Sequence, residues 1–397
     1  MSSQLNREST RYLKETDLSH RKSLGQYFTP KDVRLHLLSR LPRKKGASIL
    51  DPSCGSGEFL LSAGEYFPGG KLHGWEIDPK LVRLSRKALP RAEIVRGDSL
   101  ERDCLQRFDF VIGNPPYFEF KPEPAVRNRY REVISGRANI FSMFVKLGLN
   151  LLRPGGYLAY VIPPSLNNGA YFAGLRSYII EHANIEHLEV LKSSSLFHRA
   201  QQMVMIMVLR KTPNRGDHVF SRGGLTIFSS DAEKLSRAFR GKKTLRQLGF
   251  TVRTGRVVWN QHRTRLTHSP RRGITLIWAH NITADGLMLG NATDKPQYIK
   301  TDKYDIGPAI VVNRVTGAAG RARLKAALIE DGVRFVGENH VNVIYPPPGG
   351  NRKTSLSRLE KIASQISSPE ASRVMQLVTG NTQVSRTELE RLLPLDV

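Results

Sequence analysis

The segment Ile49-Leu-Asp-Pro-Ser-Cys-Gly-Ser-Gly-Glu-Phe-Leu60 joins a short apolar run to a glycine-containing turn and the start of a helical pattern. This order is typical of the first strand–helix unit of a parallel sheet. Gly55 and Gly57 would let the backbone approach a ligand at the carboxyl end of the strand. A dinucleotide fingerprint would place a third glycine at position 60, where leucine stands, so the turn predicts a nucleoside site without a pyrophosphate cradle.

Apolar runs and helical patterns alternate through the first 215 residues. Short apolar runs separated by helix-length segments are typical of buried parallel strands, so the sequence predicts an α/β doubly wound sheet. Two further runs, at 185–191 and 202–210, have no helix-length segment between them and should pair antiparallel at one edge, giving seven strands. The other expected strands are 48–50, 72–76, 93–95, 108–112 and 157–162, and the expected helices are 58–67, 80–89, 140–152 and 171–182.

The chain is strongly basic. Its 397 residues include 61 Lys and Arg against 35 Asp and Glu, a net charge of +26. This excess favours a polyanionic partner, nucleic acid first, because basic side chains neutralise phosphates and release counterions. A solubilising surface and an acidic membrane are the alternatives. Residues 234–284 hold twelve basic side chains and no acidic one, and residues 306–329 also lack acids, so both segments predict a surface that follows phosphates.

Turn residues at 211–217 predict a domain boundary that separates residues 1–215 from residues 216–397. Beyond it the periodicity is weak, and only a helix at 354–366 is expected. Cys54 and Cys104 are too few for a disulfide framework or a cysteine zinc site, and no metal motif stands out. The N-terminus lacks the apolar core of a secretory signal, and no apolar run reaches the ~18 residues of a membrane span, so a bacterial or archaeal cytoplasm is expected.

Acidic residues follow three consecutive predicted strands. Asp51 ends the first, where it would repel a phosphate but suit a cationic ligand. Glu76, in Gly74-Trp-Glu-Ile-Asp-Pro79, lies where a carboxylate can accept hydrogen bonds from both ribose hydroxyls, while Asp78 before Pro79 also has the pattern of a helix N-cap. Asp98, after the third strand, is either an acceptor for an adenine amine or a turn aspartate. Because parallel strands end at one sheet edge, these acids predict a shared ligand site there.

The most specific signal is Phe108-Asp-Phe-Val-Ile-Gly-Asn-Pro-Pro-Tyr117, a hydrophobic strand that runs into two prolines. Proline lacks an N–H and holds the preceding residue extended, so the loop is stiff and rich in acceptors. Asn114 offers a side-chain oxygen, Pro115 a carbonyl oxygen and Tyr117 a flat ring. Two acceptors and a stacking ring match the exocyclic amine of a planar base. The alternative is a purely structural proline turn.

Taken together, residues ~20–210 resemble the gamma-class, TaqI-like adenine-specific DNA methyltransferases of restriction–modification systems. Gly25-Gln-Tyr-Phe-Thr-Pro30 resembles that class's N-terminal cofactor motif, and the glycine turn, the acids and the Asn-Pro-Pro-Tyr loop follow in the class's order. Thr29 and Pro30 also have the pattern of an N-cap and first residue of a helix over 31–41. Residues 216–397 lie where the class keeps its target-recognition domain, although the match there rests mainly on basic character and position.

The resemblance implies a seven-stranded S-adenosylmethionine-dependent fold that methylates the N6 amine of an adenine flipped out of duplex DNA. It assigns the target base to Asn114-Pro-Pro-Tyr117 and makes Phe197 a candidate second ring against the base, the alternative for Phe197 being an apolar anchor of the edge hairpin. A restriction endonuclease that shares the DNA site is a possible companion. The resemblance implies that the catalytic group is Asn114, Pro115, Pro116, Tyr117 and Phe197, and that the cofactor site is Phe28, Thr29, Asp51, Ser53, Cys54, Gly55, Glu76, Ile77, Asp98 and Ser99.

The second domain supplies candidates for DNA contact, and contact with phosphates is expected to outnumber base reading. Three other activities remain open: an RNA base methyltransferase, a protein glutamine methyltransferase, and a DNA-binding protein without activity. Cytosine N4 methylation is disfavoured because that family usually has serine at position 114, and an attached nuclease has no unassigned residues to use. The candidate DNA contacts are Arg253, Arg256, Trp259, Arg263, Arg265 and Arg314, with Trp278 as a further aromatic candidate.

Overall fold

The computed structural model describes residues 5–102, 107–167, 171–191, 204–290, 294–314, 323–349, 352–379 and 383–397. The chain divides into two compact units. The first comprises residues 1–166 and 170–219, and the second comprises residues 167–169 and 220–397. The sequence places a boundary at 215–216, close to this division.

A seven-stranded sheet forms the centre of the first unit, as predicted. Its order is β3-β2-β1-β4-β7-β9-β8. The strands from β3 to β7 are parallel, whereas β9 pairs antiparallel with both β7 and β8, which confirms the expected antiparallel pair at one edge. The strands are β1 Ser48–Asp51, β2 Lys71–Glu76, β3 Glu93–Arg96, β4 Phe108–Gly113, β7 Leu152–Ile162, β8 Asn184–Leu191 and β9 Val204–Arg210.

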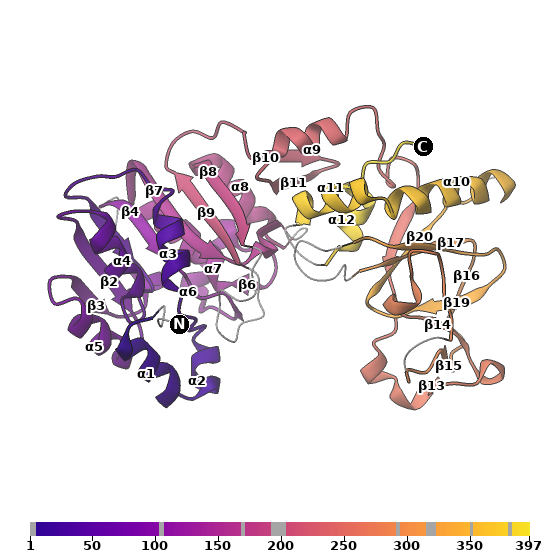
Figure 1. Ribbon diagram of the computed structural model, residues 1–397, viewed down its shortest axis with the longest axis horizontal. Coiled ribbons are helices and arrows are strands. Elements are labelled where there is room, and N and C mark those ends of the chain that lie inside the picture. The colour runs from indigo at the N-terminus through magenta and orange to yellow at the C-terminus, as the bar shows by residue number, and fades with distance from the viewer. Residues whose placement is uncertain are drawn as a thin grey trace. The chain divides into compact units, whose positions relative to one another are not determined.

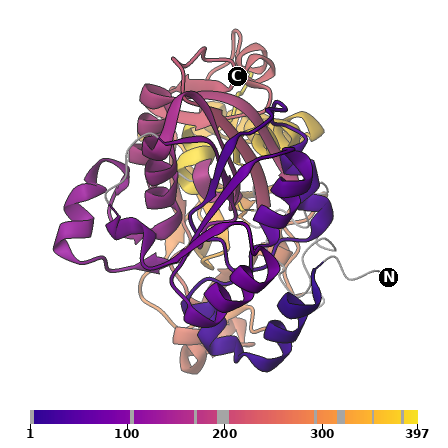
Figure 2. The ribbon, with the colours of Figure 1, turned by 90° about the vertical axis from the view of Figure 1, so that its left-hand side faces the viewer.

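Helices cover both faces of this sheet (Figures 1 and 2). Ile49, Phe110 and Ala159 share one core cluster with apolar residues of α3, α4 and α5, while α7 packs against β4 and β7 on the other face. Gly148 of α7 lies so close to Leu158 that a Cβ atom would come within 2.4 Å of it. The helices are α1 Arg7–Glu15, α2 Leu18–Ser23, α3 Lys31–Leu38, α4 Glu58–Tyr66, α5 Pro79–Ala88, α6 Pro124–Arg129, α7 Ile140–Leu151 and α8 Ala173–His182, with short 3-10 turns η1 Ser99–Glu101, η2 Arg131–Val133 and η3 Pro164–Asn167 and a small ladder of β5 Glu119–Phe120 and β6 Ala138–Asn139.

One detail of the predicted first helix is wrong. Helix α3 begins at Lys31, its N-cap is Pro30, and no side chain caps it. Thr29 therefore does not serve as the N-cap, and its hydroxyl oxygen is buried without a hydrogen-bond partner. By contrast, Asp78 caps α5 as expected, since its side chain accepts from the Lys80 N–H with Pro79 at the first helical position.

The described residues of the second unit form two small sheets, a hairpin and the helices α9 to α12 (Figure 1). The four-stranded sheet is antiparallel in the order β12-β20-β17-β18, and the five-stranded sheet has the order β13-β15-β14-β19-β16. Helix α10 confirms the helix expected at 354–366. The strands are β10 Val219–Arg222, β11 Leu225–Phe228, β12 Thr251–Thr254, β13 Leu266–Thr267, β14 Ile274–Ile277, β15 Tyr298–Ile299, β16 Asp305–Ile306, β17 Ala309–Asn313, β18 Ala326–Ile329, β19 Arg334–Gly337 and β20 Val341–Tyr345; the helices are α9 Ala232–Ala238, α10 Arg352–Ile366, α11 Pro369–Thr379 and α12 Arg386–Arg391, with 3-10 turns η4 Trp259–Gln261, η5 Arg263–Arg265, η6 Pro270–Arg272 and η7 Ala279–Asn281.

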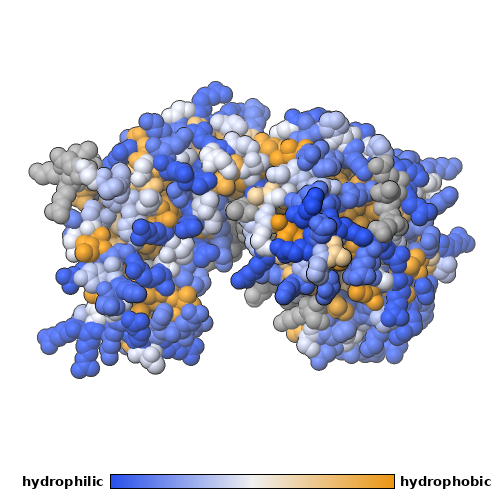
Figure 3. Space-filling view, turned by 180° about the vertical axis from the view of Figure 1, so that it is seen from behind, coloured by the Kyte–Doolittle hydropathy of each residue, from blue (hydrophilic) through white to orange (hydrophobic). Residues whose placement is uncertain are grey.

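Hydrophilic side chains predominate on the face that Figure 3 shows, with apolar residues scattered among them. Within the described ranges, no helix combines the length and the apolar content that crossing a membrane requires. The same ranges contain no group of three or more His, Cys, Asp or Glu side chains arranged to hold a metal ion.

Candidate active site

A cavity of about 280 Å³ opens at the carboxyl ends of β1, β2, β3 and β4 in the first unit. It brings together the glycine turn, the acids that follow the strands, the segment Leu24–Thr29 and the start of the Asn-Pro-Pro-Tyr loop. Pro115 and Tyr117 are not among the residues that line it, and Phe197 lies outside the described residues. The predicted site residues that line the cavity are Phe28, Thr29, Asp51, Ser53, Cys54, Gly55, Glu76, Ile77, Asp98, Ser99, Asn114 and Pro116.

The glycine turn between β1 and α4 needs its glycines for backbone reasons. Gly55 has φ +56° and Gly57, the N-cap of α4, has φ +86°, which are left-handed values that side chains with a Cβ atom rarely adopt. At Gly57 a Cβ atom would also come within 2.8 Å of Leu89. Beside them, burial raises the pKa of the Cys54 thiol, so Cys54 stays neutral and lines the cavity as a small apolar group.

Two buried carboxylates end β1 and β2. Asp51 accepts a hydrogen bond from the Ser53 N–H at 3.0 Å. Glu76 accepts from the Gly55 N–H and the Asp78 N–H, each at 2.8 Å, so its two oxygens hold the turn in place. Burial, with a smaller contribution from the charge of Glu76, raises the pKa of Asp51 to about 8. Burial also raises the pKa of Glu76.

The electrostatics of the cavity are opposite to those of the chain. Its lining contains four carboxylate side chains, Asp51, Glu58, Glu76 and Asp98, and no Lys, Arg or His among the described residues. Glu58 pairs with Arg34, whereas Asp51, Glu76 and Asp98 form no ion pair with any described residue. Because a buried carboxylate without a cationic partner is costly to ionise, these three favour a ligand that brings positive charge. In a protein of net charge +26, this local excess of acid marks a site for a cation rather than for a phosphate.

The third acid also has a structural role. Asp98 caps the 3-10 turn η1 by accepting from the Leu100 N–H at 2.9 Å. Neighbouring Ser99 donates its hydroxyl to the Pro52 carbonyl at 2.6 Å, which ties this turn to the glycine turn. The turn-aspartate interpretation of Asp98 is thus correct, and the carboxylate still lines the cavity. Ile77 also lines the cavity and is 50% exposed, so it offers an apolar surface to a ligand.

The Asn-Pro-Pro-Tyr loop leaves β4 directly beside Asp51. Gly113, at φ +148°, is required because a Cβ atom would lie 2.7 Å from the Asp51 Oδ1 atom. Asn114 donates from Nδ2 to the carbonyl of Tyr27 at 3.0 Å. Its Oδ1 atom is buried without a hydrogen-bond partner. The Tyr27 carbonyl therefore fixes the orientation of the amide and leaves its oxygen as a free acceptor in the cavity wall.

The N-terminal segment Gly25–Tyr27 packs against this loop, a contact that the sequence did not predict. Gly25, at φ +62°, packs so closely on Pro116 that a Cβ atom would come within 2.8 Å of the proline side chain. The rings of Tyr27 and Tyr117 are stacked, with an angle of 6° between their planes and a distance of 6.1 Å between their centroids. Burial raises the pKa of Tyr117 to about 12, which keeps the phenol neutral. The ring that the sequence assigns to the target base thus already has an aromatic neighbour.

A family model for N-6 DNA methylases matches residues 12–249, which is more than half of the chain. The chain belongs to this family. The family assignment agrees with the predicted methylation of adenine N6 in DNA and favours it over the RNA and glutamine alternatives. The gamma class and the roles of single residues stay predictions.

Two relatives of this N-6 DNA methylase match it over most of their length. The type II methyltransferase M.CvrRI of Paramecium bursaria Chlorella virus XZ-6E is 27% identical over 289 residues, which cover 71% of this chain and 74% of the relative. M.BsuBI of Bacillus subtilis is 24% identical over 449 aligned residues, covering 94% and 88%. Among solved structures, a class I S-adenosylmethionine-dependent methyltransferase from Listeria monocytogenes is 21% identical with a TM-score of 0.45, covering 52% of this chain and 67% of its own.

The candidate DNA contacts of this methylase lie in the second unit, and most are exposed. Arg253 lies over the ring of Tyr345, and Arg263 over the ring of Trp259, at 5.4 Å and 5.0 Å from the ring centroids. Arg265 donates to the Lys300 carbonyl at 2.9 Å, which leaves its remaining N–H groups available. These three side chains remain candidates for contact with DNA.

Three other candidates fit less well. Trp278 is wrong as a surface aromatic, because it is 3% exposed and its indole N–H donates to the Pro296 carbonyl at 3.0 Å. Arg256 forms an ion pair with Asp305 of β16, an edge strand of the five-stranded sheet. Arg314 is half-buried and donates to the Asn339 carbonyl at 3.2 Å.

Proposed function

We propose that this chain transfers a methyl group from S-adenosylmethionine to the N6 amine of an adenine in duplex DNA, as the modification enzyme of a restriction–modification system. The observation that supports the proposal best is an acidic cavity in a basic, DNA-methylase-family protein, with the free Asn114 oxygen in its wall. The two relatives described above are type II methyltransferases, which supports the restriction–modification role.

The cavity fits S-adenosylmethionine, a nucleoside that carries a sulfonium and an amino-acid group. Thr29 and Ser53 line it, and their buried hydroxyl oxygens have no hydrogen-bond partner among the described residues, so both can bond to a polar ligand. Asp51 and these hydroxyls would hold the cationic amino-acid part, Glu76 would accept from the ribose hydroxyls with its remaining lone pairs, and Asp98 would accept from the adenine amine. The bound cofactor would supply an electrophilic methyl group.

Asn114 and Pro115 would act on the target base. The lone pair of an adenine amine is delocalised into the ring, so the amine is a poor nucleophile. Hydrogen bonds from the amine to the Asn114 Oδ1 atom and the Pro115 carbonyl would favour a pyramidal, more nucleophilic nitrogen and orient it for in-line attack. No strong base is needed, because the nitrogen loses its proton after it has become cationic. Stacking on Tyr117 would offset part of the cost of unstacking the base.

The substrate class is tested by offering the purified chain tritiated S-adenosylmethionine with duplex DNA, structured RNA or protein of equal mass. We expect label in duplex DNA alone, and N6-methyladenine as the modified nucleoside after digestion and mass spectrometry. Label confined to RNA or protein, or modification at cytosine, would refute the proposal. Sequencing of DNA from cells that express the chain, with detection of modified adenines, would then show whether methylation is confined to one site.

The raised pKa of Asp51 predicts a pH dependence of cofactor binding. Below about pH 8 the free protein holds this carboxyl protonated, and a cationic ligand favours its ionised form, so binding releases a proton. Affinity should therefore rise with pH and level off near pH 8. Calorimetric Kd values from pH 6 to pH 9 test this. Asp51→Asn is the reference, because it removes the titration of Asp51 and retains the titration of the ligand. Parallel curves for the two proteins would contradict the role of Asp51.

A further inference from the structure

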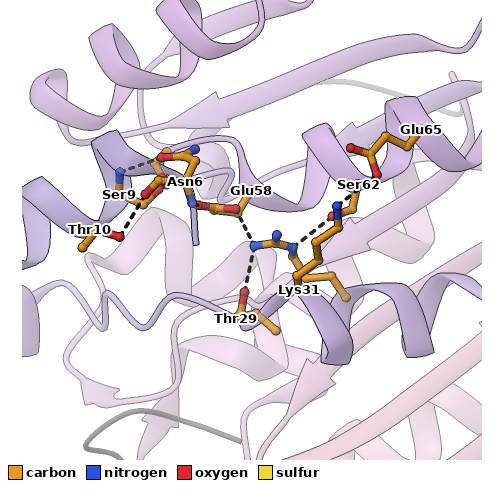
Figure 4. Close-up of polar contacts among 10 residues, drawn as sticks. Asn6, Ser9, Thr10, Thr29, Lys31, Glu58, Ser62 and Glu65 are labelled. Atoms are coloured by element: carbon orange, nitrogen blue, oxygen red, sulfur yellow. Dashed lines mark hydrogen bonds and ion pairs between the residues drawn. The ribbon is translucent and has the colours of Figure 1, made fainter. Parts of the chain in front are cut away.

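A buried ion pair joins Glu58, which lines the cavity, to Arg34, which lies outside its lining. Arg34 of α3 is 3% exposed and Glu58, the first residue of α4, is 5% exposed. The guanidinium Nη1 atom lies 2.5 Å from Glu58 Oε2. It also donates to the Thr29 carbonyl at 2.9 Å, while Nε donates to the Ser62 hydroxyl at 3.0 Å (Figure 4). One planar guanidinium thus connects α3, α4 and the loop segment that contains Thr29.

The second oxygen of Glu58 reaches further toward the N-terminus. Oε1 accepts from the Asn6 N–H at 2.9 Å, and Asn6 in turn caps α1 by accepting from the Ser9 N–H at 2.7 Å. The Ser9 hydroxyl is 2.7 Å from that of Ser56 in the glycine turn. The Glu58 carboxylate at the start of α4 therefore joins the Asn6 segment through one oxygen and Arg34 through the other (Figure 4).

Stability alone is a weak reason for this arrangement. Burying two charges costs desolvation that their attraction often only offsets, and apolar replacement of such a pair is often neutral or stabilising. An exposed pair, Lys31 with Glu65 at 3.5 Å, joins the same two helices without that cost, with side chains 47% and 63% exposed (Figure 4). What the buried pair adds is a fixed position for the Thr29 backbone, because the guanidinium fork sets both distance and direction.

We propose that Arg34 and Glu58 are positioning residues for the cofactor: they hold the Thr29 backbone so that its unpartnered hydroxyl lines the cavity, and they anchor the segment whose Tyr27 carbonyl orients Asn114. The inference rests on the proposed S-adenosylmethionine site. Neither side chain needs to react with the ligand. Their role is to restrict the motion of the groups that contact the ligand. Groups that are already fixed lose less conformational entropy on binding, so the affinity is higher than with a flexible segment.

The test compares two matched double variants. Arg34→Met with Glu58→Gln removes the buried charges and keeps an oxygen for the Asn6 N–H, whereas Lys31→Met with Glu65→Gln removes the exposed pair between the same helices. We expect the first to raise the calorimetric Kd for S-adenosylmethionine by at least ~10-fold, since small misplacement of binding groups is costly. The second should change it by less than ~2-fold. The Kd for duplex DNA and the thermal midpoint serve as readouts of folding and of the second unit.

A cycle with Thr29→Val separates positioning from general loosening. If the pair acts through the Thr29 hydroxyl, the combined variant binds no more than ~2-fold worse than the weaker of its parents, a non-additive result. Additive losses, or equal cofactor affinity in wild type and the Arg34→Met/Glu58→Gln variant, would overturn the inference. If that variant does not fold, Arg34→Lys retains the charge without the planar fork, and unchanged affinity there overturns the inference equally. Wild type that binds no S-adenosylmethionine would instead overturn the proposed cofactor site itself.

Discussion

Replacement of Asn114 by alanine is expected to lower the methyl-transfer rate by at least ~10²-fold at saturating cofactor and DNA, the scale of one lost preorganised polar contact. Asn114 Oδ1 is buried in the cavity wall with no partner, held there by the Nδ2 bond to the Tyr27 carbonyl. In the proposed reaction its acceptor strength matters most as the amine becomes cationic, so its loss should appear in kcat rather than in cofactor affinity.

Single-turnover rates with labelled cofactor, together with a calorimetric Kd for S-adenosylmethionine, separate these effects. Asn150→Ala is the matched control, since this asparagine lies on α7 and accepts from the Tyr178 hydroxyl at 2.9 Å, away from the cavity lining. It should leave the rate unchanged. Asn114→Asp keeps an oxygen but loses the donor to the Tyr27 carbonyl, so an intermediate rate is expected. Near-normal turnover by Asn114→Ala would remove the loop from the reaction altogether.

The parallel core and its acidic edge could be predicted from sequence because both depend on local order. An apolar run ending in Asp51, Glu76 or Asn114 places that residue at the carboxyl edge by strand geometry alone, and the sheet order then brings the edges together. Strand pairing in this unit is the expected arrangement of a doubly wound sheet, so the fold class alone indicates which strands are neighbours.

Other features of the site depend on contacts that no local pattern encodes. Arg34 and Glu58 are 24 positions apart on two helices, and nothing in either helix marks them as a pair. Thr29 has the sequence pattern of an N-cap, yet the helix begins one residue later than such a cap requires, so the hydroxyl is left for the cavity. The parallel rings of Tyr27 and Tyr117 and the close packing of Gly25 on Pro116 likewise join residues about ninety positions apart, which no local pattern predicts.

The second unit escaped prediction because its strands are short and their partners distant. β12 pairs with β20, some ninety positions later, and several ladders contain only two residues, too few to show a period. The same long-range contacts reduce the free positive charge of the acid-free basic segment 234–284. Besides the local pair of Arg237 with Glu233, acids distant in the sequence form ion pairs with three of its basic residues: Glu370 with Lys242, Glu390 with Arg246 and Asp305 with Arg256. Charge along the chain therefore overstates the free positive charge of the surface.

Binding to duplex DNA is expected to weaken by at least ~10²-fold between 50 and 200 mM salt, because a protein that neutralises several phosphates releases as many counterions. Arg253, Arg263 and Arg265 are exposed and form no ion pair with any described acid, so they should supply much of this dependence. Substituting Arg253, Arg263 and Arg265 together by glutamine should reduce the slope of log affinity against log salt by about 3, close to one per phosphate contact. Fluorescence anisotropy with one duplex across a salt series measures both quantities.

Arg237→Gln is the reference for this slope, since Arg237 on α9 already pairs with Glu233 one helical turn away and carries little net charge to the surface. Its substitution should change the slope by much less than one phosphate contact. A nearly flat salt response of the wild type would contradict the proposal that the basic second unit binds DNA. A steep response that survives the triple substitution would keep DNA as the partner and move the phosphate contacts to other basic residues, which the same assay can then locate one substitution at a time.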